Sequence, residues 1–350
     1  MSGSHGIAIV LGTRPEVIKN WAIVEALREA QVRHCVLHTN QHADWTMHGE
    51  QFEQLGYRPD AVLDGRYSLG RAVDWVGERL RQDRFDTVLV NGDTAAALVG
   101  ALAGMYSDRR IVHVEAGLRS FDPRMHEERN RIMVDAVAHL LLAYTEREAV
   151  YLRGQRECRG EVRVVGNTTI DLLHSFEDRL VTPRRGPFLF ATMHRKEFTD
   201  DPARMRSVFA ALATIANEVP VVLPLHPRTA DAMRRAGIGS GATGAVELVT
   251  PMGPFEALAH IAAAECVLTD SGCVQEEACI LGTPCVTVRD NSERGITLEL
   301  GANVLSGFAT EAIVRHARTQ RSLGRGTWRH PYGEPGVGRR IVEALVGRPS

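Results

Sequence analysis

Charged residues of both signs crowd the segment "HVEAGLRSFDPRMHEERNR", residues 113–131. Glu115 directly follows the apolar run "RIVHV", and Glu127 stands where a helical pattern begins. Carboxylates at the end of a buried strand can act as general acid and base, and neighbouring arginines keep them ionised at neutral pH. The alternative is a solvated loop that leads into a surface helix. These residue types alone leave both interpretations open.

Polar residues also follow most other predicted strands. In open α/β sheets, ligands bind outside the carboxyl ends of the strands. Any one of these residues could belong to a solvated loop, but their recurrence in both halves of the chain favours a single polar cleft. They are Thr13–Arg14, Gln41–His42, Asp93–Thr94, Glu115, His194–Arg195, His226, Asp270–Ser271 and Arg289–Asp290.

Two segments have the pattern of a phosphate site at a helix start. In "GTRPE" (12–16), Thr13 can cap the helix beside Arg14, and Lys19 lies one turn further on. In "TDSGCVQEE" (269–277), Gly272 lets the backbone approach a ligand closely. Unpaired amides at a helix start attract anions. Plain capping without a ligand is the alternative for each segment.

The second segment also carries Glu276 and Glu277. A carboxylate that accepts from ribose hydroxyls is a common device for binding nucleotides. A phosphate site and a ribose carboxylate in one segment suggest a nucleoside diphosphate ligand.

These groups are positioned by short β-branched runs that alternate with helical patterns. The alternation predicts right-handed βαβ units and parallel sheets, hence two Rossmann-like doubly wound α/β domains facing across a cleft. We expect a first domain over residues 1–172 and a second over 186–335, with a final helix at about 336–350 packing back on the first. Expected strands cover 6–12, 34–40, 86–92, 110–115, 188–194, 219–227, 246–251, 265–271 and 284–290, and helices cover 14–30, 69–83, 94–107 and about 127–145.

Composition narrows the class of protein. A chain of 350 residues suggests two domains, and a net charge of −2 gives no reason to expect a nucleic-acid or membrane partner. We find no signal peptide and no run of apolar residues long enough to span a bilayer. The six cysteines include no C-x-x-C pair. Buried free thiols in a cytoplasmic protein are therefore expected.

Two sequence patterns that could indicate a cofactor or metal site are not supported by their context. "GSGATG" (239–244) matches G-x-G-x-x-G, but it follows a helical pattern and leads into a strand, the reverse of the dinucleotide-binding order. His34 and His38 fall on one predicted strand, where they are too far apart to share a metal ion. We expect no cofactor and no metal.

The motifs taken together resemble the non-hydrolysing UDP-N-acetylglucosamine 2-epimerases, from about residue 7 to about residue 345. The resemblance implies a glycosyltransferase-B type fold, a homodimer and no added cofactor. It further implies the interconversion of UDP-GlcNAc and UDP-ManNAc by elimination of UDP and its re-addition to 2-acetamidoglucal. The motifs are "GTRPEVIK", "NGDT", "HVEAGLRS", "EERNR", "GNTTIDLL", "MHRKE", "LPLHPRT", "LTDSGCVQEE", "LGTPCVTVRDNSER" and "GANVLSG".

The resemblance also implies roles for single residues. The acid–base group would be Asp93, Glu115 and Glu127, supported by Lys19, and His194 would contact the leaving diphosphate. The residues implied for UDP and sugar are Arg14, Arg119, Asn167, His226, Ser271, Gly272 and Glu277. Residues that match part of a second, regulatory nucleotide site in some members are Gln41, His42, Arg195 and again His226.

The sequence departs from the family pattern at His126, Cys273 and Gly295. "NQHADWTM", "RSFDPRM" and "PLHPRT" are closer to the branch that acts on 2,3-diacetamido-glucuronate sugars, which makes that sugar a second candidate substrate. A hydrolysing epimerase that releases ManNAc, a glycosyltransferase and a nucleotide-sugar sensor are further hypotheses. A sensor has no need of the three acid–base carboxylates.

Overall fold

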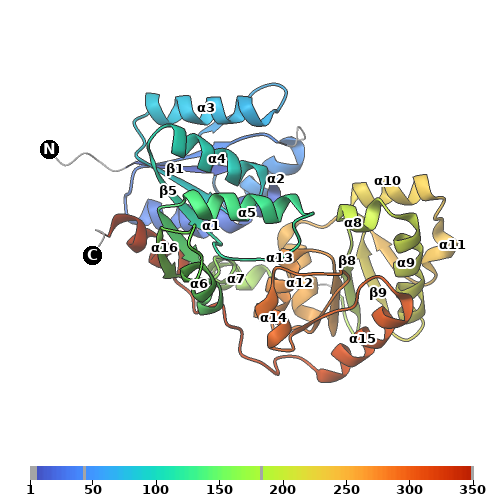
Figure 1. Cartoon of the computed structure of the whole chain (residues 1–350). Coiled ribbons are helices and arrows are strands. Elements are labelled where there is room, and N and C mark those ends of the chain that lie inside the picture. Colours follow the sequence, from blue (N-terminus) through green and yellow to red (C-terminus); the bar gives the residue numbers. More distant parts are fainter. Residues whose placement is uncertain (1–5, 42–44, 182–183, 348–350) are drawn as a thin grey trace. The chain divides into compact units, whose positions relative to one another are not determined.

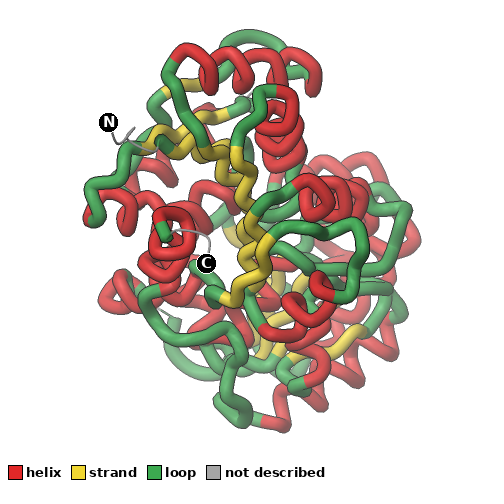
Figure 2. Tube along the Cα trace, turned by 60° about the vertical axis from the view of Figure 1, so that its left-hand side comes forward, coloured by secondary structure: helices red, strands yellow, loops and turns green. Residues whose placement is uncertain are grey.

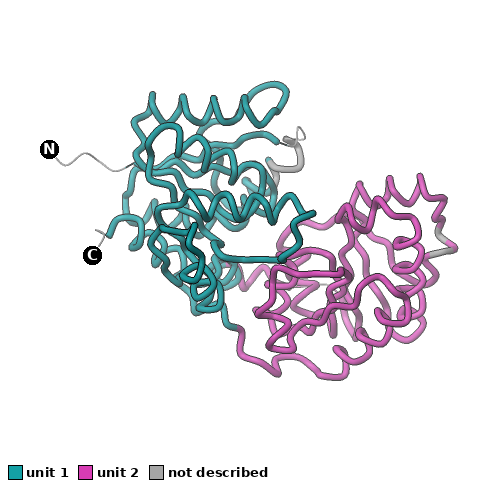
Figure 3. The backbone as a smooth tube through the Cα atoms, in the orientation of Figure 1, with its two compact units in different colours: residues 1–175, 331–350 teal, residues 176–330 magenta. Residues whose placement is uncertain are grey.

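The computed structural model describes residues 6–41, 45–181 and 184–347. The chain forms two compact units, which we call unit 1 (residues 1–175 and 331–350) and unit 2 (residues 176–330) (Figure 3). Each unit contains one parallel sheet with helices between successive strands, which confirms the predicted α/β class. Within each unit the strands form a layer with helices packed against it (Figure 2).

The sheet of unit 1 has the order β3-β2-β1-β4-β5-β6-β7, and every neighbouring pair is parallel. Its central strands β1 and β4 are buried along their whole length because both faces of the sheet are covered. The bounds are β1 Ile7–Leu11, β2 His34–His38, β3 Ala61–Val62, β4 Thr87–Asn91, β5 Arg110–Val114, β6 Leu140–Ala143 and β7 Glu161–Val164.

The helices of unit 1 form two layers (Figure 1). Against one face lie α1 (Arg14–Glu29) and the helices that contact it: α2 (Trp45–Leu55), α7 (Thr169–Ser175) and α16 (Val337–Val346). The apolar cluster on the other face is built from α3 (Leu69–Gln82), α4 (Ala95–Tyr106), α5 (His126–Val137) and α6 (Glu146–Arg153).

The C-terminal helix α16 is fastened to unit 1 by a carboxylate. Asp171 on α7 accepts hydrogen bonds from the amides of Gly336 (2.7 Å), Val337 (3.0 Å) and Gly338 (2.7 Å). A Cβ on Gly338 would lie 2.2 Å from the carbonyl oxygen of Ala22, so only glycine permits this close approach of α16 to α1. The last helix thus completes the layer formed by α1 and α7.

One predicted element is wrong. The helix expected over about 127–145 ends at Val137 as α5, and Leu140–Ala143 is strand β6, between β5 and β7. Ala138 leaves the helix with extended dihedrals, φ −72° and ψ 138°. A strand buried on both faces has no polar alternation, so the run "LLLA" cannot be distinguished from a helix by its periodicity.

Unit 2 has a six-stranded parallel sheet in the order β10-β9-β8-β11-β12-β13. Strand β13 was not predicted, and the segment 239–244, expected as a glycine loop, contains the short helix α11. The other helices of unit 2 were expected only as parts of an alternating βα series, without bounds. The strands are β8 Leu189–Thr192, β9 Val221–Pro224, β10 Glu247–Val249, β11 Cys266–Thr269, β12 Cys285–Thr287 and β13 Asn303–Leu305. The helices are α8 Lys196–Thr199, α9 Pro202–Ala216, α10 Pro227–Ala236, α11 Ser240–Thr243, α12 Pro254–Ala263, α13 Gly272–Ile280, α14 Gly295–Glu299 and α15 Thr310–Leu323.

All six cysteines are free thiols, and four of them are buried. Burial raises the pKa of Cys35, Cys266 and Cys279 to about 12, which leaves these thiols protonated and unreactive at neutral pH. Among the described residues, no helix is long and apolar enough to cross a membrane.

Candidate active site

Glu115 is the first residue after β5 and is only 2% exposed. Its backbone is left-handed (φ 70°), an uncommon conformation for a residue other than glycine that is often found at functional sites. Its Oε2 contacts Lys19 Nζ and accepts from Tyr144 Oη at 3.2 Å. Gly92 leaves room for this carboxylate, because a Cβ there would lie 3.3 Å from Oε2. Glu115 is therefore a buried carboxylate that two donors hold in place.

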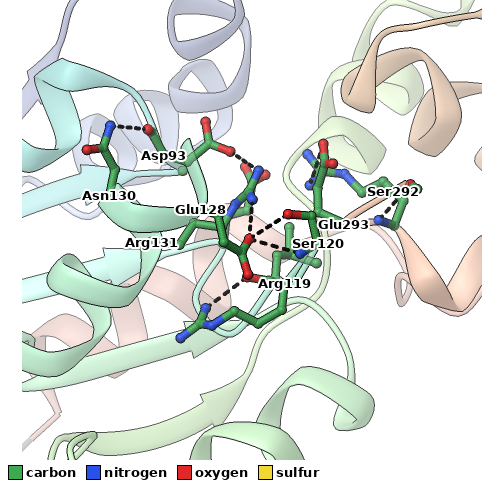
Figure 4. A network of polar contacts seen from close by, with 12 residues as sticks. Asp93, Arg119, Ser120, Glu128, Asn130, Arg131, Ser292 and Glu293 are labelled. Carbon is green, nitrogen blue, oxygen red and sulfur yellow. Dashed lines mark hydrogen bonds and ion pairs between the residues drawn. The ribbon is translucent and has the colours of Figure 1, made fainter. Parts of the chain in front are cut away.

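Asp93 lies in the turn after β4 and is tied to α5 (Figure 4). Arg131 pairs with the Asp93 carboxylate, and Asn130 Nδ2 donates to the Asp93 carbonyl at 2.8 Å. The same Arg131 donates to Glu128 Oε2 at 2.8 Å. Asp93 retains 22% side-chain exposure, so its carboxylate is both oriented and accessible.

Glu128 organises the loop between β5 and α5. Its carboxylate accepts from the amide (2.9 Å) and hydroxyl (3.0 Å) of Ser120 and from the amide of Phe121 (2.9 Å). Phe121 has a left-handed backbone (φ 59°), which these bonds support. Glu128 thus determines the course of the loop that connects Glu115 to α5.

Glu127 lies in the first turn of α5 and is partly exposed. It precedes Asn130 and Arg131 by about one helical turn, and both of these residues contact Asp93. Strands β1, β4 and β5 are neighbours in the sheet, so their carboxyl ends meet at one edge. The predicted residues Lys19, Asp93, Glu115 and Glu127 all follow these strands at that edge.

A fully buried ion cluster lies under this edge. His113 Nδ1 is 2.6 Å from Asp135 Oδ1, and His113 Nε2 is 2.9 Å from the carbonyl oxygen of Gly92. Both ring nitrogens of His113 thus face oxygen atoms of the protein. Burial would raise the pKa of Asp135, but His113 and Arg119 outweigh burial and lower it. The cluster holds the turn that precedes Asp93.

Arg119, predicted to bind substrate, belongs to this cluster. Its NH1 lies 2.7 Å from Asp135 Oδ2, and its guanidinium stacks 5.0 Å from the ring centroid of Tyr151. Only 5% of Arg119 is exposed. These contacts make it a part of the framework beneath the loop, and contact with a ligand stays a prediction.

Two backbone amides of "GTRPE", those of Gly12 and Thr13, are bonded to a side chain of the same segment, and an anion at the start of α1 stays a prediction. The Glu16 carboxylate accepts from the amides of Gly12 (2.9 Å) and Thr13 (2.8 Å) and from Thr94 Oγ1 (2.6 Å). Burial raises the pKa of Glu16 to about 7. Arg14 is only partly buried. When the side-chain amide of Gln51 is oriented so that its oxygen faces Arg14, that oxygen accepts from Arg14 Nε at 3.0 Å.

Two other predicted residues hold helix starts in unit 1. Asn167 is fully buried, and its Oδ1 accepts from the amide of Thr169 at 2.9 Å at the start of α7. Gln41 Oε1 accepts from the amide of Ala96 at 3.1 Å, at the start of α4. His42, predicted with Gln41 for a regulatory site, lies outside the described residues.

In unit 2, Asp270 connects the ends of the neighbouring strands β8 and β11. Its Oδ2 accepts from the backbone amides of both His194 and Arg195, each at 2.8 Å. Asp270 Oδ1 lies 3.5 Å from His194 Nδ1. Asp270 is 1% exposed, whereas the His194 side chain is 38% exposed. A buried carboxylate thus positions an accessible imidazole.

His226 lies beside this group, after β9. Its Nδ1 accepts from the amide of Arg228 at 3.2 Å and caps α10. The rings of His226 and His194 lie 5.5 Å apart between centroids. The fold therefore brings together His194, Arg195 and His226, which the sequence predicted separately.

Helix α13 starts at the carboxyl end of β11, with Ser271 as its N-cap. A Cβ on Gly272 would lie 2.4 Å from Glu293 Oε1, so a larger residue here would have to displace the Glu293 side chain. Glu276 is buried and ion-paired with Arg294 at 2.6 Å, whereas Glu277 is partly exposed. Of the two glutamates, Glu277 is the one accessible to a ligand.

The sequence analysis missed Tyr144, His113 and Asp135, and it included Arg131 only among the arginines expected to keep nearby carboxylates ionised. Tyr144 directly follows strand β6, and its place at a strand end could have marked it as a candidate site residue. It was overlooked because the sequence of β6 was predicted as part of a helix. The other three are joined by contacts between distant parts of the chain. In the part of the chain that the structure describes, no group of three or more His, Cys, Asp or Glu side chains could hold a metal ion.

Comparisons with known proteins agree on one family. The sequence model described as UDP-N-acetylglucosamine 2-epimerase matches residues 25–346. The UDP-2,3-diacetamido-2,3-dideoxy-D-glucuronate 2-epimerase of Pseudomonas aeruginosa is 39% identical over 97% of this chain and 99% of its own. The UDP-N-acetylglucosamine 2-epimerase of Methanocaldococcus jannaschii is 33% identical over 97% of this chain and 98% of its own.

Solved structures support the same assignment. The crystal structure of the M. jannaschii enzyme in complex with UDP-GlcNAc and UDP superposes with a TM-score of 0.85 and covers 97% of this chain and 99% of that one. The spinosyn rhamnosyltransferase SpnG has a TM-score of 0.59 at 13% identity, covers 97% of this chain and 99% of its own, and shares the fold alone.

Proposed function

The chain belongs to the UDP-N-acetylglucosamine 2-epimerase family, and we propose that it interconverts UDP-GlcNAc and UDP-ManNAc by inversion at C2. The observation that carries the proposal is the set of oriented carboxylates at one edge of the unit 1 sheet: Asp93, Glu115 and Glu127. We propose that the two compact units are the domains expected from the sequence, one for proton transfer and the other for UDP.

The reaction has to remove a very weakly acidic proton from sugar C2. Cleavage of the C1–O bond together with proton loss avoids a full carbanion and gives UDP and 2-acetamidoglucal. A proton then reaches C2 from the opposite face while UDP adds back at C1. Carboxylates that serve both faces of the sugar are needed, and a buried ionised one is the suitable base. Glu115 with its Lys19 partner fits this requirement.

Departure of the diphosphate is the task proposed for unit 2. Asp270 accepts from the backbone amide of His194, and the accessible His194 side chain would donate to the leaving phosphate. The start of α13 at Ser271 and Gly272 would also contact this phosphate. Electrostatic support of a leaving group lowers the barrier to its departure. Glu277 would accept from the ribose, and Arg14 and His226 would complete the UDP contacts.

A second substrate is favoured by one specific observation. The P. aeruginosa relative, at 39% identity, is named for UDP-2,3-diacetamido-2,3-dideoxy-D-glucuronate. The same chemistry at C2 would serve that sugar, but its C6 carboxylate requires an additional cationic contact. The hydrolysing epimerase and the glycosyltransferase differ in their products, which are free ManNAc or a glycosylated acceptor.

We also propose that the protein is a cytoplasmic homodimer. The free, mostly buried thiols suit a reducing compartment. Unit 1 exposes apolar side chains on α4, α5 and α6 that a second copy would cover. They are Tyr106 (78% exposed), Ile132 (50%), Met133 (44%) and Val150 (61%). Light scattering of the purified protein measures the assembly, and a monomer would contradict the proposal.

The deciding experiment is a proton NMR time course with UDP-GlcNAc in D2O. Growth of UDP-ManNAc with deuterium at C2 is expected. Free ManNAc with UDP would indicate the hydrolysing reaction instead. Absence of both exchange and product would exclude UDP-GlcNAc as a sufficient substrate, and the diacetamido-glucuronate sugar would then be measured in the same way.

A further inference from the structure

Tyr144 contacts the candidate base, although nothing in the sequence motifs points to it. It is the first residue after β6, and its Oη donates to Glu115 Oε2 at 3.2 Å. Lys19 Nζ contacts the same oxygen. Tyr144 is 1% exposed and Glu115 is 2% exposed, so water does not compete strongly for this bond.

The fold determines where this hydroxyl lies. Strands β5 and β6 pair in parallel with Val114 opposite Leu142, so the residues that follow them emerge at the same edge. The Tyr144 ring packs edge-on against Tyr332, with centroids 6.4 Å apart and an interplanar angle of 89°. The carbonyl of Tyr332 accepts from the amide of Asn167 at 3.0 Å, which anchors the C-terminal segment behind the ring.

Two donors on one carboxylate oxygen favour the ionised carboxylate and limit its rotation. A group that removes a proton from carbon has to be ionised and correctly oriented before the substrate reacts. We propose that Tyr144 is a positioning residue that keeps Glu115 ionised and oriented as the base of the epimerisation. This inference rests on the proposed function.

The charged surroundings of Glu115 determine the expected pH effect. Lys19 faces it from α1, and Asp93 follows Gly92, which lies against it. His113 and Asp135 pair with each other beneath the same edge. Removal of the Tyr144 hydroxyl leaves Lys19 as a donor but removes one bond to the charged form. Glu115 is then protonated at a higher pH, so the acidic limb of the activity profile moves upward.

The kinetic test compares Tyr144→Phe with Tyr57→Phe. Tyr57 is also buried, but its hydroxyl bonds to the Val17 carbonyl and to no carboxylate. For Tyr144→Phe we expect kcat to fall about tenfold, which is the loss of one hydrogen bond to a charged group. We expect KM to stay within about threefold and the acidic limb of kcat/KM to rise by about one pH unit. For Tyr57→Phe we expect lower thermal stability and an unchanged pH profile. Wild-type kcat and pH profile in Tyr144→Phe would overturn the proposal.

A second measurement needs no substrate. Thermal unfolding of Tyr144→Phe, Glu115→Gln and the double variant forms a cycle that measures the coupling between the two side chains. We expect the double variant to lose less Tm than the sum of the single losses, because either substitution already removes the hydrogen bond to a charged carboxylate. Additive losses would overturn the proposal. If the two residues are coupled but the wild-type protein turns over no UDP-sugar, the proposed function is refuted. The interaction between Tyr144 and Glu115 would still stand in that case.

Discussion

The two units prepare their sheet edges by different means. In unit 1, side-chain charges are paired with one another and buried: Lys19 with Glu115, and Asp135 with Arg119. Unit 2 also buries charge pairs, Glu276 with Arg294 and Glu293 with Arg289. There, however, the carboxylate of Asp270 holds two backbone amides, and a glycine lies at the start of α13. Unit 1 thus orients carboxylates, whereas unit 2 orients main chain and an accessible imidazole.

The difference matches the two halves of the proposed reaction. Proton transfer at carbon requires carboxylates whose ionisation is controlled, and burial with selected partners provides that control. Diphosphate binding requires donors with close access to the ligand, which backbone amides and a glycine provide. Substitutions in the two units should therefore affect turnover and UDP affinity separately.

The largest effect on turnover is expected for Glu127→Gln in unit 1. Loss of one member of the acid–base group should reduce kcat by about two orders of magnitude or more. UDP affinity, measured by calorimetry, should stay within about twofold of wild type, because the residues proposed to contact UDP, apart from Arg14, lie in unit 2. Glu146→Gln, which removes an exposed partner of Arg153 on α6, is the matched control. Near-normal turnover in folded Glu127→Gln would refute its role.

The next largest effect is on stability and concerns the ion cluster of unit 1. Asp135→Asn leaves His113 and Arg119 buried without their counter-ion, so the free energy of unfolding should fall by about 3 kcal/mol. Urea denaturation measures it. Glu53→Gln breaks the exposed pair with Arg58 and should change stability by less than about 0.5 kcal/mol. A loss below about 1 kcal/mol for Asp135→Asn would mean that the cluster is not needed for the fold.

Glu16 gives unit 1 a pH-dependent stability. Its pKa is raised from 4.5 to about 7 in the folded state, so the folded protein binds this proton more tightly than the unfolded chain. Stability should therefore decrease as pH rises from 4.5 to 7 and then level off. The side chain in Glu16→Gln cannot ionise, so this loss of stability should be absent from the variant. Between about pH 4 and about pH 8, the free energy of unfolding of the variant should therefore rise by up to about 3 kcal/mol relative to that of wild type. Urea denaturation at both pH values tests this, and parallel pH profiles would contradict it.

The smallest effect is expected for Gly272→Ala in unit 2. The new Cβ would displace Glu293, which pairs with Arg289 at 3.0 Å, and would shift the start of α13. The Kd for UDP should rise about tenfold, which corresponds to a loss of about 1.4 kcal/mol of binding free energy, while kcat changes less. Gly70→Ala, on α3 with nothing within 4 Å of its Cβ, is the control and should leave binding unchanged. Unaltered UDP affinity in Gly272→Ala would mean that the segment at Gly272 does not contribute to UDP binding.

The sequence by itself determined the α/β class, the family, most of the strands and the helices α1, α3, α4 and α16. The expected segments 6–12 and 14–30 correspond to β1 and α1, because apolar periodicity and helix-start residues are local properties. The polar residues at strand ends were also visible, since each directly follows its own strand. These include Asp93, Glu115 and His194.

Only the tertiary structure decided what those residues contact. Strand order places Tyr144 beside Glu115, a pairing that no spacing encodes and that the erroneous helix over 127–145 concealed. Folding also brings Asp135 to His113 and Thr94 to the carboxylate of Glu16. Periodicity reports which face of an element is buried, but the partner of a buried charge depends on which distant segment packs against that face.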